Sequence, residues 1–317
     1  MSNIISAQQV RSQLGYVELI NKLEHAFASD IETPLRQHFD IPNPVSERET
    51  TLLMMPSWQV GEDIGVKLVT VVPESYKFDL PSIKGIYVLI NAVTGEVKAT
   101  IDAPSLTAKR TAAASALASR FLSRENSRSL LMIGTGTLSS ELIEAHCSVR
   151  PIEQIFVWGR DIQKAKQVLK KISHLPVQAT VVEDISEAIA FVDIVSCATM
   201  SIEPLISGTW LKPGQHLDMV GAYRPDMREA DDECLLRSRI VVDNLQGALK
   251  ETGDLAIPLS KQIIKPEDIE ADLFALARKD THFLRQPTDI TFFKSVGHAL
   301  EDLAAAQLLV SKLEGNS

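Results

Sequence analysis

Two glycines and three small polar side chains stand at a spacing that can bind a phosphate, in the stretch Gly134-Thr-Gly-Thr-Leu-Ser139. The stretch follows the apolar run Ser129–Ile133 and precedes a segment with helical spacing of apolar residues. The first glycine permits a tight turn, and the second lets a pyrophosphate approach the backbone. We therefore predict a dinucleotide-binding strand, turn and helix, whose free amides face the phosphates. The alternative is a glycine turn in an unrelated α/β fold. The predicted contacts are Gly134, Thr135, Gly136, Thr137 and Leu138.

The end of the next predicted strand, Val157-Trp-Gly-Arg160, falls where such a fold meets the adenosine ribose. An acid there favours NAD, whereas an arginine can pair with the 2′-phosphate of NADP. Arg160 therefore favours NADPH as the cofactor. NADH is the alternative cofactor, because the acid Asp161 follows immediately. Without such a role Arg160 is a solvated residue at the start of a helix.

Small residues also end two later strands, in Cys197-Ala-Thr199 and in Val220-Gly221. Because ligands of open parallel sheets lie beyond the carboxyl ends of the strands, these residues are predicted to line the cofactor. The Cys197 side chain is interpreted as packing and not as a nucleophile. Ser295, in Ser-Val-Gly297, is predicted to start a helix and to offer amides to ligands near the nicotinamide; otherwise it is an ordinary N-cap. These predicted contacts are Cys197, Ala198, Thr199, Val220, Gly221 and Ser295.

Lys67 is a cation inside an apolar strand-like run, residues 65–72. Alternation with period two places it on one face with Val69 and Val71, and neither face reads as solvated. A buried lysine is costly and is often functional. The alternative is a long side chain that reaches water from the start of the strand. Arg110, in an apolar helix, is open to a similar alternative, a surface salt bridge.

The elements that must position these residues fall into two blocks. Helices are predicted from Ser6 and over residues 16–28, followed by strands at 51–55, 65–72, 85–91 and 97–101 that form a mostly antiparallel sheet. After a helix at 105–122, strands and helices alternate, which predicts βαβ units on a parallel sheet. A last Ala/Leu helix is predicted to open at Thr291 and to return to the first block. The expected fold is α/β, with a substrate and dimerisation domain (residues 1–120 and 290–317) and a Rossmann domain (residues 121–289).

Composition limits the possible functions. The 317 residues are 45% hydrophobic and 23% charged, as in proteins with a sizeable core, and the net charge of −9 argues against nucleic-acid binding. Cys147, Cys197 and Cys234 form no CxxC pair, so no disulfide framework or metal site is expected. No signal sequence or membrane-spanning run is found, so the expected location is cytoplasmic.

Seven short motifs occur in an order that resembles the ornithine cyclodeaminase/mu-crystallin family. They are Pro34-Leu-Arg36, Gly65-Val-Lys67, Leu106-Thr-Ala-Lys-Arg110, Gly134-Thr-Gly136, Cys197-Ala-Thr199, Gly221-Ala-Tyr-Arg-Pro-Asp226 and Lys294-Ser-Val-Gly297. The resemblance covers residues 30–305 and implies a Rossmann domain joined to an antiparallel-sheet domain that forms a homodimer. It also implies NAD(P)-dependent hydride transfer at the α-carbon of amino or imino acids.

By this resemblance Arg36 and Arg110 match the carboxylate-binding arginines of the family, and Lys67 matches its active-site lysine. A planar, permanently charged guanidinium suits a carboxylate. Where the ornithine cyclodeaminases carry an aspartate, this chain has Tyr223, which is neutral at pH 7 and is not a ready base. The Tyr223 ring is expected to wall a pocket for a small ring, and its hydroxyl to hydrogen-bond an imine or a water; the alternative is that Tyr223 only packs at the rim.

The pattern Gly221-Ala-Tyr-Arg-Pro-Asp-Met-Arg-Glu229, which contains this tyrosine, resembles the branch that reduces Δ1-pyrroline-2-carboxylate to L-proline. The hypothesis is thus an NAD(P)H-dependent reductase of a cyclic imino acid, with Δ1-piperideine-2-carboxylate as a possible second substrate. The alternatives are ornithine cyclodeaminase, alanine dehydrogenase, or binding of a small ligand without turnover as in mu-crystallin.

Overall fold

The computed structural model describes residues 3–46 and 48–315 and divides into two compact units. Unit 1 comprises Met1–Thr111 with His298–Ser317, and unit 2 comprises Ala112–Gly297. The first boundary falls inside helix α3 (Ala103–Leu122), whereas the sequence placed it at the end of that helix. A helix carries no composition change at such a point, so its interior boundary leaves no signal in the sequence.

Unit 1 begins with two helices whose starts the sequence predicts. Ser6 caps α1 (Ala7–Gln13) in a capping box with Gln9, and α2 (Tyr16–Ala28) buries its apolar face. Strand β1 (Asn3–Ile5) precedes these helices, and the strands that follow them are β2 (Gln37–Ile41), β3 (Thr50–Trp58), β4 (Asp63–Val71), β5 (Ile83–Asn91) and β6 (Val97–Asp102). Strands β1 and β2 were not predicted, because one is only 3 residues long and the other is exposed throughout.

Within residues 3–46 and 48–111 these strands form one sheet of order β1-β6-β5-β4-β3-β2. The pairing is antiparallel from β6 to β2, as predicted, and β1 joins β6 in parallel. Lys67 pairs with Met55 on β3 and with Tyr87 on β5, so these three side chains share one face.

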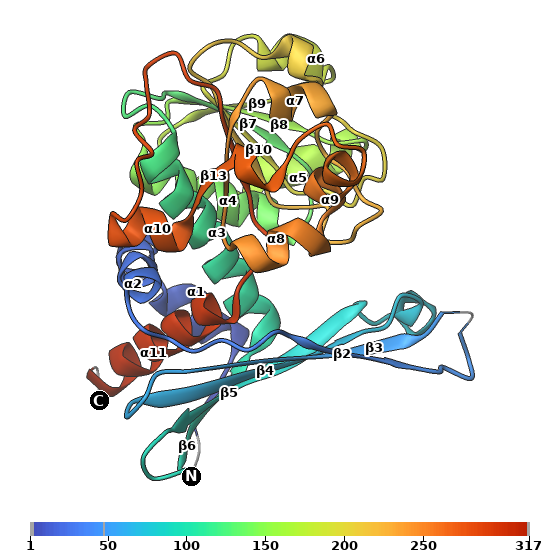
Figure 1. The fold of residues 1–317 in the computed structure, drawn as a ribbon. Helices are drawn as coiled ribbons and strands as arrows, with labels where there is room; N and C mark the ends of the chain where they lie inside the picture. The colour runs from blue at the N-terminus through green and yellow to red at the C-terminus, as the bar shows by residue number, and fades with distance from the viewer. Residues whose placement is uncertain (1–2, 47, 316–317) are drawn as a thin grey trace. The chain divides into compact units, whose positions relative to one another are not determined.

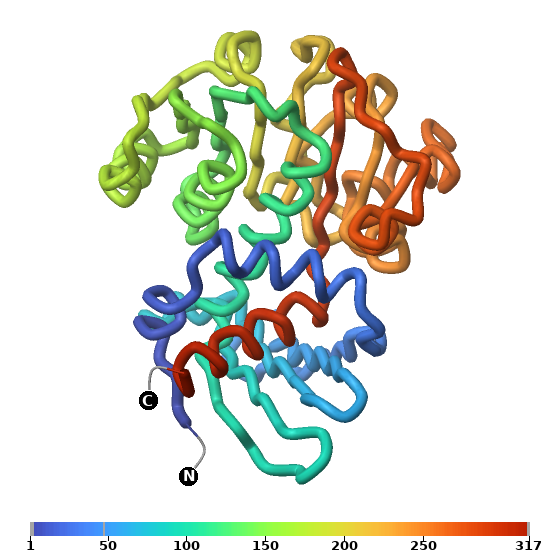
Figure 2. Tube along the Cα trace, turned by 90° about the vertical axis from the view of Figure 1, so that its left-hand side faces the viewer, coloured from blue at the N-terminus to red at the C-terminus, as the bar shows by residue number. Residues whose placement is uncertain are grey.

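The C-terminal helix α11 (Ala299–Gly315) returns to unit 1. It contacts α2 and strands β3 to β6, and Figure 2 shows it (red) beside the N-terminal helices (blue). Helices α1, α2 and α11 lie on one side of the sheet (Figure 1), and this is the side that Lys67 faces. Alternate residues of the strands, including Leu68 and Ile86, point to the opposite face.

Unit 2 is a parallel sheet of order β13-β12-β14-β11-β10-β7-β8-β9 within residues 112–297. The strand order reverses between β7 and β10, which is the switch point of a doubly wound fold, where dinucleotides bind. The strands are β7 (Ser129–Ile133), β8 (Gln154–Trp158), β9 (Gln178–Val181), β10 (Ile194–Cys197), β11 (His216–Met219), β12 (Arg239–Val242), β13 (Ile269–Asp272) and β14 (Thr291–Lys294). The helices that follow α3 are α4 (Thr137–Val149), α5 (Ile162–Lys171), α6 (Ile185–Ile189), α7 (Asp232–Leu236), α8 (Leu245–Glu251), α9 (Gly253–Ser260) and α10 (Leu273–Arg278).

The predicted helix start at Thr291 is wrong. Thr291–Lys294 is strand β14, fully buried between β11 and β12, and the helix begins only at Ala299. Threonine and phenylalanine favour strands, and the long Ala/Leu helix behind them masked this short run. The error matters because Lys294, expected in the first turn of a helix, lies instead at the end of a buried strand of the sheet.

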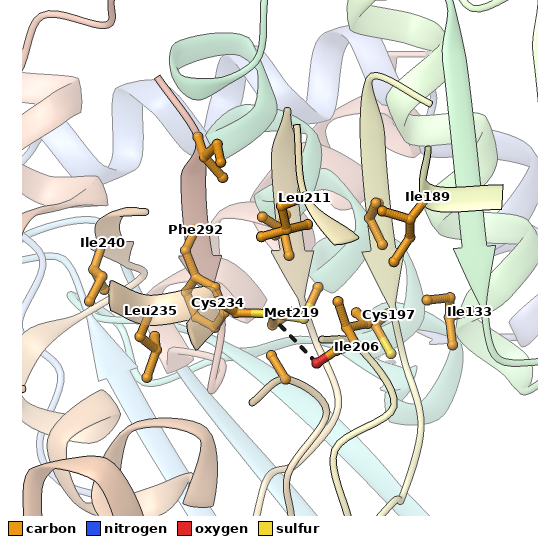
Figure 3. Close-up of a cluster of buried hydrophobic side chains, with 14 of the residues drawn as sticks. Ile133, Ile189, Cys197, Ile206, Leu211, Met219, Cys234, Leu235, Ile240 and Phe292 are labelled. Carbon is orange, nitrogen blue, oxygen red and sulfur yellow. Dashed lines mark hydrogen bonds between the residues drawn. The ribbon is translucent and has the colours of Figure 1, made fainter. Parts of the chain in front are cut away.

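The core of unit 2 lies along the parallel strands, where Figure 3 shows Ile133, Cys197, Met219 and Phe292 among other apolar side chains. Cys234 Sγ contacts the carbonyl oxygen of Ile206 at 3.6 Å. The thiols of Cys197 and Cys234 are thus packing groups, and burial raises the pKa of each. No helix in the described part of the chain is long and apolar enough to cross a membrane.

Candidate functional site

Lys67 lies at the middle of β4 and is buried against α11. Its side chain is 4% exposed, and its Nζ donates a hydrogen bond to Asp302 Oδ2 over 2.6 Å. Burial disfavours the ammonium and lowers the pKa of Lys67 to about 8, although the charge of Asp302 opposes this change. The side chain therefore does not reach out to water, and it can exchange a proton near neutral pH.

Arg110, from α3, contacts the same carboxylate. Its Nε donates to Asp302 Oδ1 at 3.0 Å, and its Nη1 donates to Glu301 Oε2 at 2.7 Å. Burial opposes ionisation of Asp302, but the charges of Arg110 and Lys67 hold the pKa of this acid below its ordinary value. We call these four buried residues the Lys67 cluster: Lys67, Arg110, Glu301 and Asp302.

Arg36 immediately precedes β2 and is half-buried. Its charge adds to that of Arg110 in lowering the pKa of Lys67. Burial and the same two guanidinium groups together lower the pKa of His298 to about 4. The three cations predicted from the sequence thus share one electrostatic neighbourhood within unit 1, and such a neighbourhood favours an anionic ligand.

The glycine of the Gly65-Val-Lys67 motif makes room for Tyr87. A Cβ atom at position 65 would lie 1.7 Å from Tyr87 Oη, so a side chain there would displace the ring. Tyr87 is fully buried opposite Lys67, and burial raises the pKa of its hydroxyl, which stays neutral. The motif therefore places a neutral phenol and a titratable amine side by side.

Glu301 and Asp302 are functional candidates that the sequence reasoning missed. Both are fully buried in the first turn of α11. The available signal was their position in Ala299-Leu-Glu-Asp-Leu-Ala304, where two adjacent acids interrupt an apolar helix. Acids are rarely buried unless they are paired, so this pattern indicates cationic partners.

In unit 2 the glycine turn has the form that phosphate binding requires. Gly134 has φ +119°, and a Cβ there would lie 2.6 Å from the carbonyl oxygen of Ala198. Gly136 is the N-cap of α4 without a side-chain hydrogen bond, and a Cβ there would meet open space. Ser139 Oγ donates to the Gly134 carbonyl at 2.9 Å, which ties the helix to the turn. The residues present fit a pyrophosphate at this helix start.

Arg160 and Asp161 differ in how they are engaged. Asp161 caps α5 and accepts from the amides of Gln163 and Lys164 at 2.8 and 3.3 Å. Arg160 is exposed just beyond β8. Asp161, which weakened the sequence argument for NADP, is therefore engaged as the N-cap of α5.

The predicted cofactor residues at the ends of β10 and β11 are joined by a buried acid, Glu229. Its Oε1 accepts from the amide of Thr199 at 2.6 Å and from Thr199 Oγ1 at 2.9 Å. A Cβ at Gly221 would lie 2.4 Å from the same oxygen, so only glycine fits there. Burial raises the pKa of Glu229 to about 7. The charge of Lys294 opposes this rise, and the charge of Asp254 adds to it. Ala198 is half-buried between these strands, and Val220 is buried beside Gly221.

Lys294 completes this arrangement and was also missed. It is fully buried at the end of β14, its Nζ lies 3.0 Å from Asp254 Oδ2 and 3.9 Å from Glu229 Oε2, and it donates to the carbonyl oxygen of Gly221. We call Glu229, Asp254 and Lys294 the Lys294 cluster. The motif Lys294-Ser-Val-Gly297 was noted in the sequence, but the wrong helix assignment hid the burial of its lysine.

The predicted role of Ser295 needs correction. Its amide donates to the Met219 carbonyl at 3.1 Å, and the amides of Val296 and Gly297 donate to Asp243 Oδ2 at 2.7 and 2.6 Å. These amides are committed within unit 2, and the stretch is a loop and not a helix start. Among the described residues no group of His, Cys, Asp and Glu could hold a metal ion.

Tyr223 lies in the loop that follows β11, and its side chain is 49% exposed. The preceding Ala222 has φ +49°, and the following Arg224 pairs with Asp226 through its Nε at 2.9 Å. Tyr223 thus places a half-exposed aromatic ring after the carboxyl end of β11. Asp226, three residues later, is held by Arg224.

The whole chain, residues 1–317, matches the ornithine cyclodeaminase/mu-crystallin family. The chain belongs to this family. A Delta(1)-pyrroline-2-carboxylate reductase of Colwellia psychrerythraea is 40% identical over 314 residues, which cover 98% of this chain and 99% of that protein.

Two solved structures with the same fold extend the comparison. The Delta(1)-pyrroline-2-carboxylate reductase of Thermococcus litoralis, in complex with NADH and L-proline, is 32% identical with a TM-score of 0.92 and covers 99% of this chain and 98% of that one. An archaeal alanine dehydrogenase dimer with bound NAD is 27% identical with a TM-score of 0.90, over 100% of this chain and 97% of that one. The predicted family and fold class are confirmed.

Proposed function

We propose that the protein reduces Δ1-pyrroline-2-carboxylate to L-proline with a nicotinamide cofactor. The observation that carries the proposal is the buried Lys67 cluster with the half-buried Arg36 beside it, in a chain 40% identical to such a reductase. The substrate is a small cyclic imino acid whose carboxylate needs a bidentate cationic partner. Arg36 and Arg110 are the residues that supply it.

The roles within unit 1 follow from the substrate's chemistry. A bound NAD(P)H supplies the hydride that adds to the imine carbon. As the C=N bond becomes a single bond, the ring nitrogen must hold one more proton, and Lys67 is the group that can hold or provide it. Two of Arg110's donors already hold Glu301 and Asp302, and a guanidinium has five, so Arg110 retains donors for a ligand.

The roles within unit 2 concern the cofactor. The glycine turn and the start of α4 bind the pyrophosphate through Gly134, Thr135, Gly136, Thr137 and Leu138. Backbone around Cys197, Ala198, Thr199, Val220 and Gly221 lines the remainder, with Ser295 behind it. The Cys197 thiol itself points into the core.

NADPH is the preferred cofactor in this proposal, because Arg160 is exposed at the ribose end of β8 while Asp161 is engaged in capping. Replacing Arg160 by alanine is expected to raise KM for NADPH about tenfold and to change KM for NADH less than twofold, since one charge-assisted contact is worth about 1.5–3 kcal/mol. Steady-state kinetics with both cofactors measures this. An unchanged KM for NADPH would mean that Arg160 does not bind the 2′-phosphate.

Tyr223 favours imine reduction over cyclodeamination. Cyclodeamination must also release ammonia, which requires acid–base groups at the substrate's amines, and a neutral tyrosine lacks a carboxylate's basicity. We propose that the ring walls the small imine and that its hydroxyl hydrogen-bonds the imine or a water.

Three assays on the purified protein separate the candidate activities. They combine NADPH or NADH with Δ1-pyrroline-2-carboxylate or Δ1-piperideine-2-carboxylate, with pyruvate plus ammonia, and NAD with ornithine. We expect fast cofactor oxidation only with the cyclic imines. Turnover confined to ornithine or to pyruvate would replace the proposal with cyclodeaminase or alanine dehydrogenase activity, and no turnover with any substrate would leave a binding role.

We further propose that the protein is a homodimer and that the sheet face opposite α11 is its interface. Apolar side chains on this face are exposed to solvent, among them Phe39 at 47%, Ile41 at 46% and Ile86 at 44%. An uncovered apolar face of this kind marks an association site. A second copy is the occupant in this proposal because a relative with the same fold is a dimer with NAD.

Replacing Ile86 by glutamate is expected to convert the dimer to a monomer, because a buried unpaired carboxylate would face the second copy. Sedimentation velocity at micromolar concentration measures the mass of each form. Val93→Glu, which changes an exposed apolar residue in the turn after β5, is the matched control and should stay dimeric. A monomeric wild type, or a dimeric Ile86→Glu protein, would refute this interface.

A further inference from the structure

Asp302 divides its two carboxylate oxygens between two cations. Oδ2 accepts from Lys67 Nζ at 2.6 Å, and Oδ1 accepts from Arg110 Nε at 3.0 Å. The residue is fully buried in the first turn of α11, between the buried Glu301 and the buried Leu303. Because each oxygen is committed, rotation of the carboxylate would break one contact or the other, and this fixes the separation of the two cations.

The charges around Lys67 come from several elements. Arg110 comes from α3, Arg36 from the segment before β2, and Glu301 and Asp302 from α11, with Tyr87 on β5 and His298 before α11 as the other titratable neighbours. The two guanidinium groups and burial all favour loss of the proton from Lys67. Asp302, in direct contact, is the group that favours its retention.

We propose, on the basis of the function proposed above, that Asp302 is a positioning residue that keeps Lys67 protonated and aligned with Arg110 during imine reduction. When hydride adds to the imine carbon, the electron pair of the C=N bond moves to nitrogen, which takes up one proton. Only the ammonium form of Lys67 can deliver that proton, and the transfer leaves Lys67 as the neutral amine. Asp302 does not touch the substrate and acts through Lys67.

The test is the pH dependence of Asp302→Asn in the full-length protein. The wild type should lose kcat/KM for Δ1-pyrroline-2-carboxylate as pH rises through about 8, where Lys67 deprotonates. In Asp302→Asn the carboxylate charge is gone while the shape is kept, so this loss should begin at least about one pH unit lower. A loss of kcat with an unmoved pH profile would assign Asp302 a merely structural role and overturn the proposal.

Glu301→Gln is the matched control, because this neighbouring buried acid contacts Arg110 and not Lys67 in the bonds described above. It should raise KM for the imine without moving the pH profile. Asp302→Glu, which retains the charge, should return the profile towards that of the wild type while kcat stays reduced. If Asp302→Asn does not fold, Asp302→Glu carries the test: a profile displaced as far as one pH unit would contradict the proposal.

A readout without turnover separates this inference from the proposed function. In protein labelled at the lysine ε-carbon, the signal of Lys67 can be assigned by its absence from Lys67→Met, and its titration can be followed by NMR. We expect the midpoint to fall in Asp302→Asn even if the imine proves not to be the substrate. An identical midpoint in both proteins would overturn the inference while leaving the reductase activity intact.

Discussion

Replacing Lys67 by methionine is expected to lower kcat/KM for Δ1-pyrroline-2-carboxylate by about 10³-fold, within the range typical of a lost acid–base group. The side chains are similar in length, and Asp302 keeps Arg110 as a partner, so the fold should persist. The dinucleotide turn belongs to unit 2 and shares no hydrogen-bond partner with Lys67 in the contacts described above, so Kd for NADPH should change less than about twofold. Steady-state kinetics and cofactor fluorescence measure the two effects.

Lys77→Met is the matched control for this variant. Lys77 is exposed in unit 1 and pairs with Glu74 at the surface, so its loss should leave kcat/KM within about twofold of the wild type. If Lys67→Met retained more than about a tenth of the activity, the lysine would not be an acid–base group. If only KM rose while kcat stayed constant, Lys67 would serve carboxylate binding alone.

Replacing Lys294 by methionine is expected to lower the free energy of unfolding of unit 2 by about 3–5 kcal/mol, as for other buried ion pairs that lose one partner. Lys294 is the cation of a fully buried cluster with Glu229 and Asp254, and it also donates to the Gly221 carbonyl. Urea unfolding measures the loss, followed by the fluorescence of the three tryptophans, of which Trp158 and Trp210 lie in unit 2 and Trp58 lies in unit 1.

The loss of unfolding free energy in Lys294→Met should depend on pH. Even with Lys294 present, burial raises the pKa of Glu229 to about 7, so this acid contributes stability that is full below pH 4.5 and is lost as pH rises towards 7. Without the ammonium the folded-state pKa rises further, so the variant should go on losing stability above pH 7, where the wild type no longer does. The two curves should therefore diverge between pH 7 and 9.

Lys166→Met provides the control for this experiment. Lys166 is exposed on α5 in the same unit. Its replacement should change the free energy of unfolding by less than about 0.5 kcal/mol throughout this pH range. A deficit for Lys294→Met below about 1 kcal/mol, or one that shrinks as pH rises, would mean that the cluster is not held together by charge.

The sequence alone was sufficient for the family, the fold class and most of the elements. The helix over residues 16–28, the antiparallel run of strands and the glycine turn at 134–136 were predicted from local periodicity, capping and turn chemistry. These signals lie within short windows of sequence, where hydrophobic spacing and backbone preference act directly. Lys67 was likewise found from its place within an apolar strand.

Only the tertiary structure supplied the partners of the buried charges. Lys67 and Asp302 are 235 positions apart in the sequence, and the residues around either one do not indicate the other as its partner. Lys294 was hidden by a strand read as a helix, because four residues are too few for periodicity to distinguish the two. A lone charge in an apolar run predicts that a partner must exist, since burial without one is too costly. Which residue meets that need is decided by the topology that brings α11 onto β4 and β14 between β11 and β12.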